Sequence, residues 1–163
     1  TLKYFGYEGF QAVLGGILEM QHYLRQKIAQ CEDIVCVNPD DYGLVTLFRV
    51  YPEGTKAQDQ YNQELNRFEM KDELKRNNEL QQKVADQLWN WFRNGDKHSE
   101  FGYAPYISYT SGFRPTEYNR DKKDPDAVIY ALKSFPMNLN IDAKSMQTLI
   151  EMVRASRDEV SKS

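Results

Sequence analysis

The sequence predicts an α+β protein, in which an antiparallel sheet of three or four strands packs against helices on one face. The first observation is that apolar residues recur every three or four positions in long segments, as on one face of a helix. The second is that short apolar runs, bounded by turn-forming residues, lie between these segments. The third is the order helix, strand, strand, helix, strand, helix, which is typical of this architecture.

Composition limits the class of protein. The chain has 163 residues, enough for the core of one domain, and its formal net charge of −3 lacks the basic excess that nucleic-acid binding needs. It contains no run of about 18 apolar residues and no basic leader before an apolar stretch, so neither a membrane span nor a secretion signal is predicted. We therefore expect a cytoplasmic protein that binds neither nucleic acid nor membrane. Because Thr1 is not an initiator Met, we also expect a fragment or a processed form.

The first predicted element is a helix that runs to about Cys31. Its inward face would carry Phe10, Val13, Leu14, Ile17, Met20, Leu24 and Ile28. The pair Gly15-Gly16 lies inside this helix, where glycine is unfavourable, and we interpret it as a place of close packing or slight bending.

A β-hairpin is predicted next. One strand is Ile34-Val35-Cys36-Val37, the turn is rich in Asn, Pro, Asp and Gly, and the second strand covers residues 44–51. Both faces of the second strand are largely apolar, which predicts a central strand. Arg49 lies in this strand, and a charge among apolar neighbours must be paired or lie at an edge. An ion pair with a helix carboxylate is the preferred interpretation, and a site role or a surface position are the alternatives.

Residues 53–78 are polar and rich in charge, and we interpret them as a surface excursion with a short helix around Tyr61, Leu65 and Phe68. A second firm helix follows and ends at Asn94-Gly95, where glycine permits the left-handed conformation. The apolar side of this helix carries Leu80, Val84, Leu88, Trp91 and Phe92. We expect the indole rings of the helix to lie in the core.

The last third of the chain predicts a third strand over residues 103–111 that ends at Gly112. Three prolines and a charge cluster in residues 113–141 predict a long ordered loop or crossing. Asp142 would then cap a last helix, with Arg154 and Arg157 near its polar side. Its inward residues would be Met146, Leu149, Ile150, Val153 and Val160.

Candidates for chemistry are few. Cys31 and Cys36 with two distant histidines, His22 and His98, do not form a zinc pattern, and we expect the cysteines to be small buried side chains. His22 is expected at the surface or at a junction. One region of the chain is rich in aromatic residues: Phe101, Tyr103, Tyr106, Tyr109, Phe113 and Tyr118. They could line a ligand pocket, but we prefer the interpretation that they fill a core or an interface.

One resemblance is carried by the turn Gly6-Tyr7-Glu8-Gly9, the helix after it, the hairpin and the run Leu47-Phe48-Arg49-Val50-Tyr51-Pro52. These features, with the third strand and the last helix, resemble the C-terminal small domain of the group II pyridoxal-phosphate (PLP)-dependent amino acid decarboxylases, a family with the small-domain fold of fold-type I PLP enzymes. The resemblance implies that residues 1–31 form a linker helix at the junction with a missing large domain. Residues 32–163 would be the small domain, with polar excursions at 53–78 and 113–141.

The resemblance also implies an activity. The parent enzyme would decarboxylate an amino acid as a homodimer, with PLP held by the large domain of the same chain. No Lys here follows a His, as the family's cofactor lysine does, so the isolated fragment is expected to bind no cofactor and to be inactive. The family's small domain offers an arginine to the substrate carboxylate, but the corresponding residues read Tyr103-Ala104-Pro105-Tyr106. Arg114 is the nearest candidate.

Two other interpretations stay open. The chain could be a non-catalytic interaction module, or the small domain of another fold-type I PLP enzyme such as an aminotransferase. Exposed apolar area should distinguish the first of these. A small domain without its large domain should expose an apolar stripe around Leu14, Ile17 and Leu18, whereas a module should show a compact patch with a polar rim.

Overall fold

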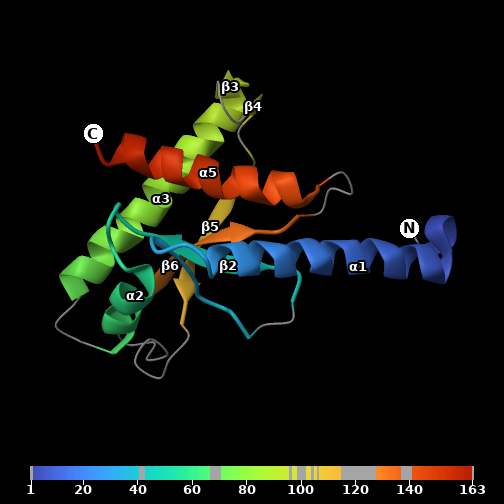
Figure 1. The fold of residues 1–163 in the computed structure, drawn as a ribbon, viewed down its shortest axis with the longest axis horizontal. Helices are drawn as coiled ribbons and strands as arrows, with labels where there is room; N and C mark the ends of the chain where they lie inside the picture. Colours follow the sequence, from blue (N-terminus) through green and yellow to red (C-terminus); the bar gives the residue numbers. More distant parts are fainter. Residues whose placement is uncertain are drawn as a thin grey trace.

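A computed structural model describes residues 2–40, 43–66, 71–95, 97–98, 102–103, 105, 107–114, 128–136 and 141–162. Its elements along the chain are α1 (Leu2–Ile28), β1 (Ile34–Cys36), β2 (Thr46–Val50), α2 (Ala57–Asn66), α3 (Lys71–Asn94), β3 (Lys97–His98), β4 (Gly102–Tyr103), β5 (Ser108–Phe113), β6 (Ile129–Ser134) and α5 (Ala143–Val160). Figure 1 shows long helices gathered around a small sheet. The predicted α+β class is confirmed.

The main sheet has four strands in the order β1-β2-β6-β5, and its neighbours all pair antiparallel. β2 lies between β1 and β6, which confirms the expectation of a central strand. Its register places Val50 opposite Ile34 on one side and Phe48 opposite Leu132 on the other. β3 and β4 form a separate small hairpin.

Both faces of the sheet are buried, because alternate residues of each strand enter different apolar clusters. Phe48 and Val50 belong to a cluster with residues of α1, α3 and α5. Tyr51 and Ala131 belong to a second cluster, to which α2 contributes Ala57 and Tyr61. The hydrophobic pattern alone gives little sign of this second cluster, which makes α2 part of the core.

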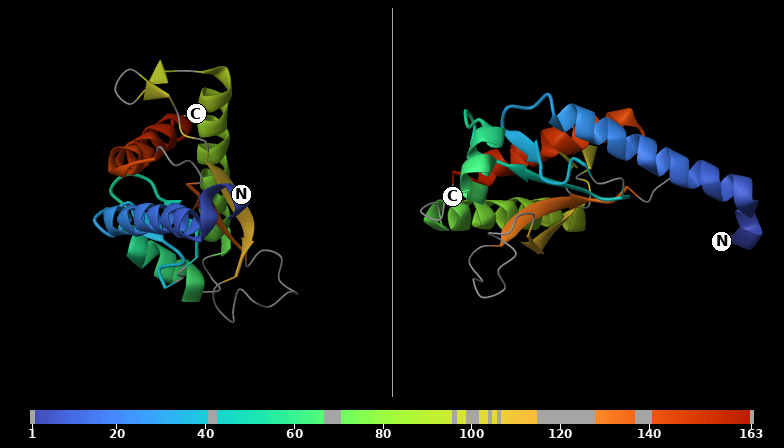
Figure 2. Two further views of the ribbon diagram at one scale, coloured as in Figure 1. Left: turned by 90° about the vertical axis from the view of Figure 1, so that its right-hand side faces the viewer. Right: turned by 90° about the horizontal axis from the view of Figure 1, so that it is seen from below.

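Helix α1 extends beyond the body of the domain (Figures 1 and 2). The chain bends at Gly6, whose φ of 68° is readily adopted only by glycine. Among the α1 residues whose burial the structure describes, Ile17 is the first buried one, and we name the preceding part, residues 2–16, the α1 arm. The second half of the helix is anchored in the first cluster by Leu24 and Ile28.

The prediction of a surface excursion over residues 53–78 is wrong. α2 occupies part of this segment, α3 already begins at Lys71, and Tyr61 and Leu74 are buried. The reason is that several of the inward residues here are polar, among them Glu64 and Asn78. Hydrophobic periodicity cannot detect a buried face built from such side chains. Phe68, the last residue of the expected short helix, lies outside the described residues.

The prediction of a loop over residues 113–141 is also wrong, because β6 lies within it and pairs with both β2 and β5. The strand is short and lies between prolines, and prolines in a sequence indicate a loop, so the pattern did not predict it. The charge cluster at residues 120–124 lies outside the part of the chain that the structure describes. The third strand, β5, runs through Gly112 to Phe113, with a register shift against β6 after Thr110.

The ends of the last two long helices follow the sequence pattern. Gly95 after α3 has a φ of 66°, and Asp142 caps α5 by accepting a hydrogen bond from the backbone N–H of Ser145. The inward residues of α5 are buried as predicted, except that Val160 is half-buried. The aromatic residues of α3 differ from expectation: Trp91 packs against the first cluster, but Trp89 and Phe92 are exposed and stack on each other.

Candidate functional site

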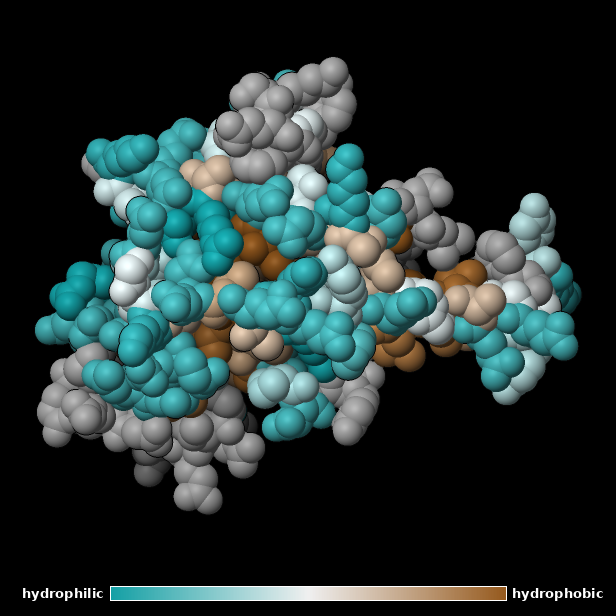
Figure 3. Space-filling view, viewed as in Figure 1, coloured by the Kyte–Doolittle hydropathy of each residue, from teal (hydrophilic) through white to brown (hydrophobic). Residues whose placement is uncertain are grey.

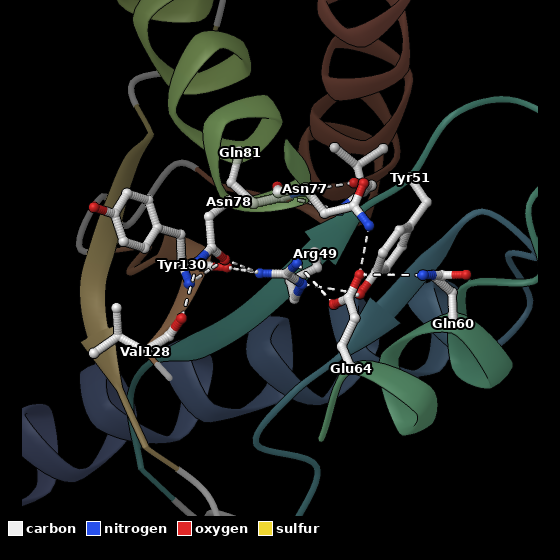
Figure 4. Close-up of polar contacts among 10 residues, drawn as sticks. Arg49, Tyr51, Gln60, Glu64, Asn77, Asn78, Gln81, Val128 and Tyr130 are labelled. Atoms are coloured by element: carbon white, nitrogen blue, oxygen red, sulfur yellow. Dashed lines mark hydrogen bonds and ion pairs between the residues drawn. The ribbon is translucent and has the colours of Figure 1, made fainter. Parts of the chain in front are cut away.

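The most densely bonded polar group in the described chain surrounds Arg49, whose side chain is fully buried. Its Nη2 forms an ion pair of 2.9 Å with Glu64 Oε2 of α2, and neither side chain is exposed. Its Nε donates to the Tyr51 hydroxyl at 2.9 Å. Figure 4 shows the guanidinium enclosed between α2, α3 and the sheet. The predicted ion pair of Arg49 with a helix carboxylate is confirmed.

Glu64 uses both carboxylate oxygens. Its Oε2 also accepts from the Tyr51 hydroxyl at 2.9 Å, and its Oε1 accepts from the side-chain amides of Asn77 and Gln60. Burial raises the pKa of Tyr51 well above its usual value, although the nearby Arg49 charge acts to lower it. The phenol is therefore a neutral hydrogen-bond donor. Arg49, Tyr51 and Glu64 all make hydrogen bonds within this group. We therefore interpret the group as a structural network and not as a site of proton transfer.

A second charged cluster joins α5 to the segment just before β1. Asp33 receives two side-chain partners, Arg154 and Arg157, each with an N–O distance of 2.5 Å. Arg157 also donates to the main-chain oxygen of Tyr51 and pairs with Asp158. The expectation that Arg157 lies on the polar side of its helix is wrong, since it is buried in this cluster.

The electrostatics of the second cluster favour the ionised form of Asp33. Partial burial acts to raise the pKa of its carboxyl group, but hydrogen bonds from Arg154 and Arg157 outweigh burial, and the pKa lies below its usual value. Beside the cluster lies a polar hollow of about 760 Å³. Its lining contains acidic side chains together with Arg154 and Arg157. Because both arginines are paired with Asp33, we assign the cluster a structural role.

Along α1 one hollow is lined mainly by apolar side chains. This hollow of about 390 Å³ is bounded by α1 and by the segments that flank the connection from β6 to α5. Its lining is Ala12, Val13, Gly16, Ile17, Glu19, Met20, Pro136 and Ile141. An added Cβ at Gly15 or Gly16 would meet no atom within 4 Å, so the interpretation of close packing at this pair is not supported. Figure 3 shows apolar residues interspersed with polar ones over this helix.

The α1 arm exposes large side chains. Tyr4 and Tyr7 are 87% and 72% exposed, and Leu18 just beyond the arm is 43% exposed. The expectation of an exposed stripe around Leu14, Ile17 and Leu18 is wrong, because Leu14 is half-buried, Ile17 is buried and only Leu18 is exposed. Tyr4, Tyr7 and Leu18 are the large, strongly exposed hydrophobic side chains that the structure describes on α1.

Arg114 directly follows β5 and is half-buried. Of the aromatic residues expected near it, Tyr109 stacks on Tyr130 at 5.8 Å between ring centroids and packs against the first cluster. Phe113 packs against the second cluster, on the other face of the sheet. These two do not line one pocket. Phe101, Tyr106 and Tyr118 lie outside the described residues, as does the side chain of Tyr103.

The remaining candidates take simple positions. His22 is exposed on α1, as expected, and its Nε2 is 2.9 Å from Gln26 Nε2. Cys31 and Cys36 are half-buried rather than buried, and both line a hollow beside α1. Burial raises the pKa of Cys31 despite the lowering effect of Arg154. Among the described residues, no group of three or more His, Cys, Asp or Glu side chains could hold a metal ion.

A scan against protein-family models and searches against curated proteins and solved structures give no significant match to this chain. Within the described ranges, no helix combines the length and hydropathy needed to cross a lipid bilayer. The residues that the sequence pattern missed are Asn78 and Gln81 of α3 and Asp33 before β1. The available signal was a strand that carries an arginine, followed along the chain by a helix with amide side chains three residues apart. Such amides can lie on one helix face and bond to the strand.

Proposed function

We propose that this chain is the C-terminal small domain of a PLP-dependent amino acid decarboxylase of the group II kind, a carboxy-lyase that works in the cytoplasm as a homodimer. The α1 arm is the observation that carries the proposal. A helix in water gains most of its stability by packing an apolar face, and this arm has no buried side chain among those the structure describes. The large, PLP-binding domain of the same chain would supply the missing surface.

The arrangement after the arm supports the same proposal. A long helix leads directly into an antiparallel hairpin, a third and fourth strand complete the sheet, and a last helix packs back on it. This is the order that the family resemblance implies. Most of the run of residues 47–52 that carries the resemblance lies in the inner strand β2, and Phe48 and Tyr51 are fully buried.

The described residues do not fit an anchor for PLP. When bound, PLP stabilises negative charge next to the amino group it holds, and it is held through a lysine in a desolvated or cationic setting. Every lysine whose side chain the structure describes is exposed or half-buried. The proposal therefore assigns the cofactor to the large domain, and the isolated chain would be inactive.

Arg114 is the residue of this chain that the proposal assigns to the substrate amino acid. A guanidinium can pair both oxygens of a carboxylate, and the end of an outer strand is a place from which it can reach another domain. In this role Arg114 would bind and orient the carboxylate of the substrate or of a neighbouring group, without taking part in bond breaking.

The cofactor assignment can be tested on the chain itself and on the longer polypeptide that would contain it. We expect the isolated chain, mixed with PLP and treated with borohydride, to show no stoichiometric label on a single lysine. The longer polypeptide should show the absorbance band of a protein–PLP aldimine and release carbon dioxide from an amino acid. A single, fully labelled lysine in the isolated chain, or a longer polypeptide without PLP, would overturn the proposal.

The role of Arg114 has a separate test in the longer polypeptide. Arg114→Met should raise the KM for the amino acid, because it removes a carboxylate partner. Arg93→Met is the matched control, since Arg93 is exposed at the end of α3. Equal KM values for the two variants would remove Arg114 from the site while leaving the decarboxylase proposal intact.

A non-catalytic interaction module is the second candidate, and the hollow along α1 is the observation that favours it. In that case the apolar surface of α1 would bind another protein instead of a domain of its own chain. Association of the longer polypeptide with PLP decides between the two, because a module has no reason to carry the cofactor. The small domain of an aminotransferase would be recognised by amino-group transfer without release of carbon dioxide.

A further inference from the structure

The pairing of β2 with β6 is interrupted at one end. Thr46 pairs with Ser134 and Phe48 with Leu132, so continuing the register would place Val50 opposite Tyr130. This pair is not formed. The backbone N–H of Val50 instead donates to Gln81 Oε1 at 2.9 Å, and the carbonyl oxygen of Val50 accepts from Gln81 Nε2 at 2.7 Å. One side chain of α3 thus takes both hydrogen bonds of a missing strand partner.

The opposite strand is satisfied in the same way. The backbone N–H of Tyr130 donates to Asn78 Oδ1 at 2.9 Å, and Asn78 Nδ2 donates to the carbonyl oxygen of Val128 at 2.9 Å. The carbonyl oxygen of Tyr130 accepts from Arg49 Nη1. Figure 4 shows Asn78, Arg49 and Tyr130 meeting at this gap.

A side-chain amide can take the place of a main-chain partner, because it carries the same kinds of hydrogen-bond donor and acceptor as a peptide group. Buried main-chain groups left without partners are costly, so a gap in a buried sheet needs such replacements. Gln81 is fully buried, and Asn78 is nearly so. They lie one helical turn apart, so both can enter the same gap.

α3 is also the element that crosses from one face of the sheet to the other. Leu74 in its first part belongs to the second cluster, and Val84 and Leu88 in its later part belong to the first. Asn78 and Gln81 lie between these two parts, at the level of the gap. The helix therefore passes the sheet where β2 and β6 separate.

We propose that Asn78 and Gln81 are positioning residues that hold β6 apart from β2 and thereby set the direction of the β5–β6 pair. Among the described strands, β5 pairs only with β6, and Arg114 follows β5. The direction in which Arg114 is presented then depends on the gap. The statement about the sheet stands without the decarboxylase proposal, and only its consequence for a substrate carboxylate rests on that proposal.

The test measures strand orientation in solution by residual dipolar couplings from the isotope-labelled chain. In the double variant Asn78→Leu/Gln81→Met, we expect the β5–β6 pair to rotate relative to the β1–β2 pair. Gln82→Met is the control, because Gln82 is the next residue of α3, is exposed and undergoes the same chemical change. A folded double variant with the orientation of the wild type would overturn the proposal.

The wild-type chain supplies a second measurement that needs no variant to fold. We expect through-hydrogen-bond couplings from the Val50 amide to the side-chain carbonyl of Gln81 and from the Tyr130 amide to that of Asn78. A coupling between the backbones of Val50 and Tyr130 would overturn the proposal, because it would show the strands paired.

A third measurement separates this inference from the proposed function. In the longer polypeptide, Gln81→Met should raise the KM for the amino acid with little change in kcat, and Gln82→Met should change neither. If the strands rotate but KM stays at the wild-type value, the positioning of β6 stands and the assignment of Arg114 to the substrate fails.

Discussion

Two clusters of charge link elements of this domain, and they are exposed to water to different extents. Arg49 and Glu64 have side chains that are 0% exposed, whereas in the other cluster Asp33 is 12% and Arg154 is 37% exposed. The Arg49 cluster is completed by neutral amides and a phenol, and the Asp33 cluster by a second arginine and a main-chain oxygen. Because solvent screens exposed ion pairs, the two clusters should respond very differently to the loss of one member.

The largest effect is expected when Glu64 is removed. Glu64→Leu leaves the buried Arg49 charge without its carboxylate, which should lower the free energy of unfolding by about 3–5 kcal/mol. Urea unfolding followed by circular dichroism measures the change. In the double variant Arg49→Met/Glu64→Leu, part of the loss should return, because no unpaired charge remains. If Glu64→Leu lowered the free energy of unfolding by less than about 1 kcal/mol, the Arg49–Glu64 ion pair would contribute no more than an exposed ion pair.

The next largest effect concerns Arg157, the buried member of the Asp33 cluster. Arg157→Met removes charge-assisted hydrogen bonds to Asp33 and to the main-chain oxygen of Tyr51, and should cost about 2–3 kcal/mol in the free energy of unfolding. Thermal and urea unfolding against the wild type give the value. A cost equal to that of Glu64→Leu would mean that partial exposure makes no difference between the clusters.

The pH dependence of stability sharpens the comparison. The pKa of Asp33 is lower in the folded chain than its usual 3.8, so its ionised form stabilises the fold above that pH and the contribution is lost as pH falls below it. Unfolding free energies measured between neutral pH and acid should therefore decline in this window. We expect Asp33→Asn to be less stable at neutral pH and to show a shallower decline. Parallel pH profiles for the variant and the wild type would contradict this linkage.

The smallest effect is expected at Arg154. It pairs with the same carboxylate as Arg157, but it is partly exposed, so Arg154→Met should cost less than about 1 kcal/mol. Added salt should reduce the difference from the wild type further, because mobile ions screen the exposed partner. A cost above that of Arg157→Met, measured in the same urea series, would reverse the assignment of the two arginines.

Much of the fold could be predicted because it follows from local pattern. Apolar spacing predicted α1, and two apolar runs separated by turn-forming residues predicted the hairpin. Apolar residues on both faces of the second run predicted the central place of β2, and single residues predicted the end of α3 at Gly95 and the cap of α5 at Asp142. The pairing of Arg49 was predictable as well. A charge in a strand that is apolar on both faces must be paired or lie at an edge, and the ion pair was the preferred of these interpretations.

The misses have a common physical cause. β6 is a short strand between prolines, and it becomes a central strand only because β2 and β5 lie on either side of it. α2 and the start of α3 bury polar residues such as Glu64 and Gln81, whose burial depends on partners far away in the chain. Hydropathy assigns such residues to the surface, because it values each side chain without its partners.

The sequence by itself determined the α+β class, the long amphipathic helices and the hairpin, and it favoured a carboxylate partner for Arg49. These depend on the spacing of neighbouring residues and on the cost of burying an unpaired charge, both of which can be read along the chain. Only the tertiary structure decided which carboxylate pairs with Arg49, that Asp33 gathers two arginines of α5, and that amides of α3 replace a rung of the sheet. Hydrogen bonds between residues distant in sequence require three-dimensional proximity, and spacing along the chain carries no record of it.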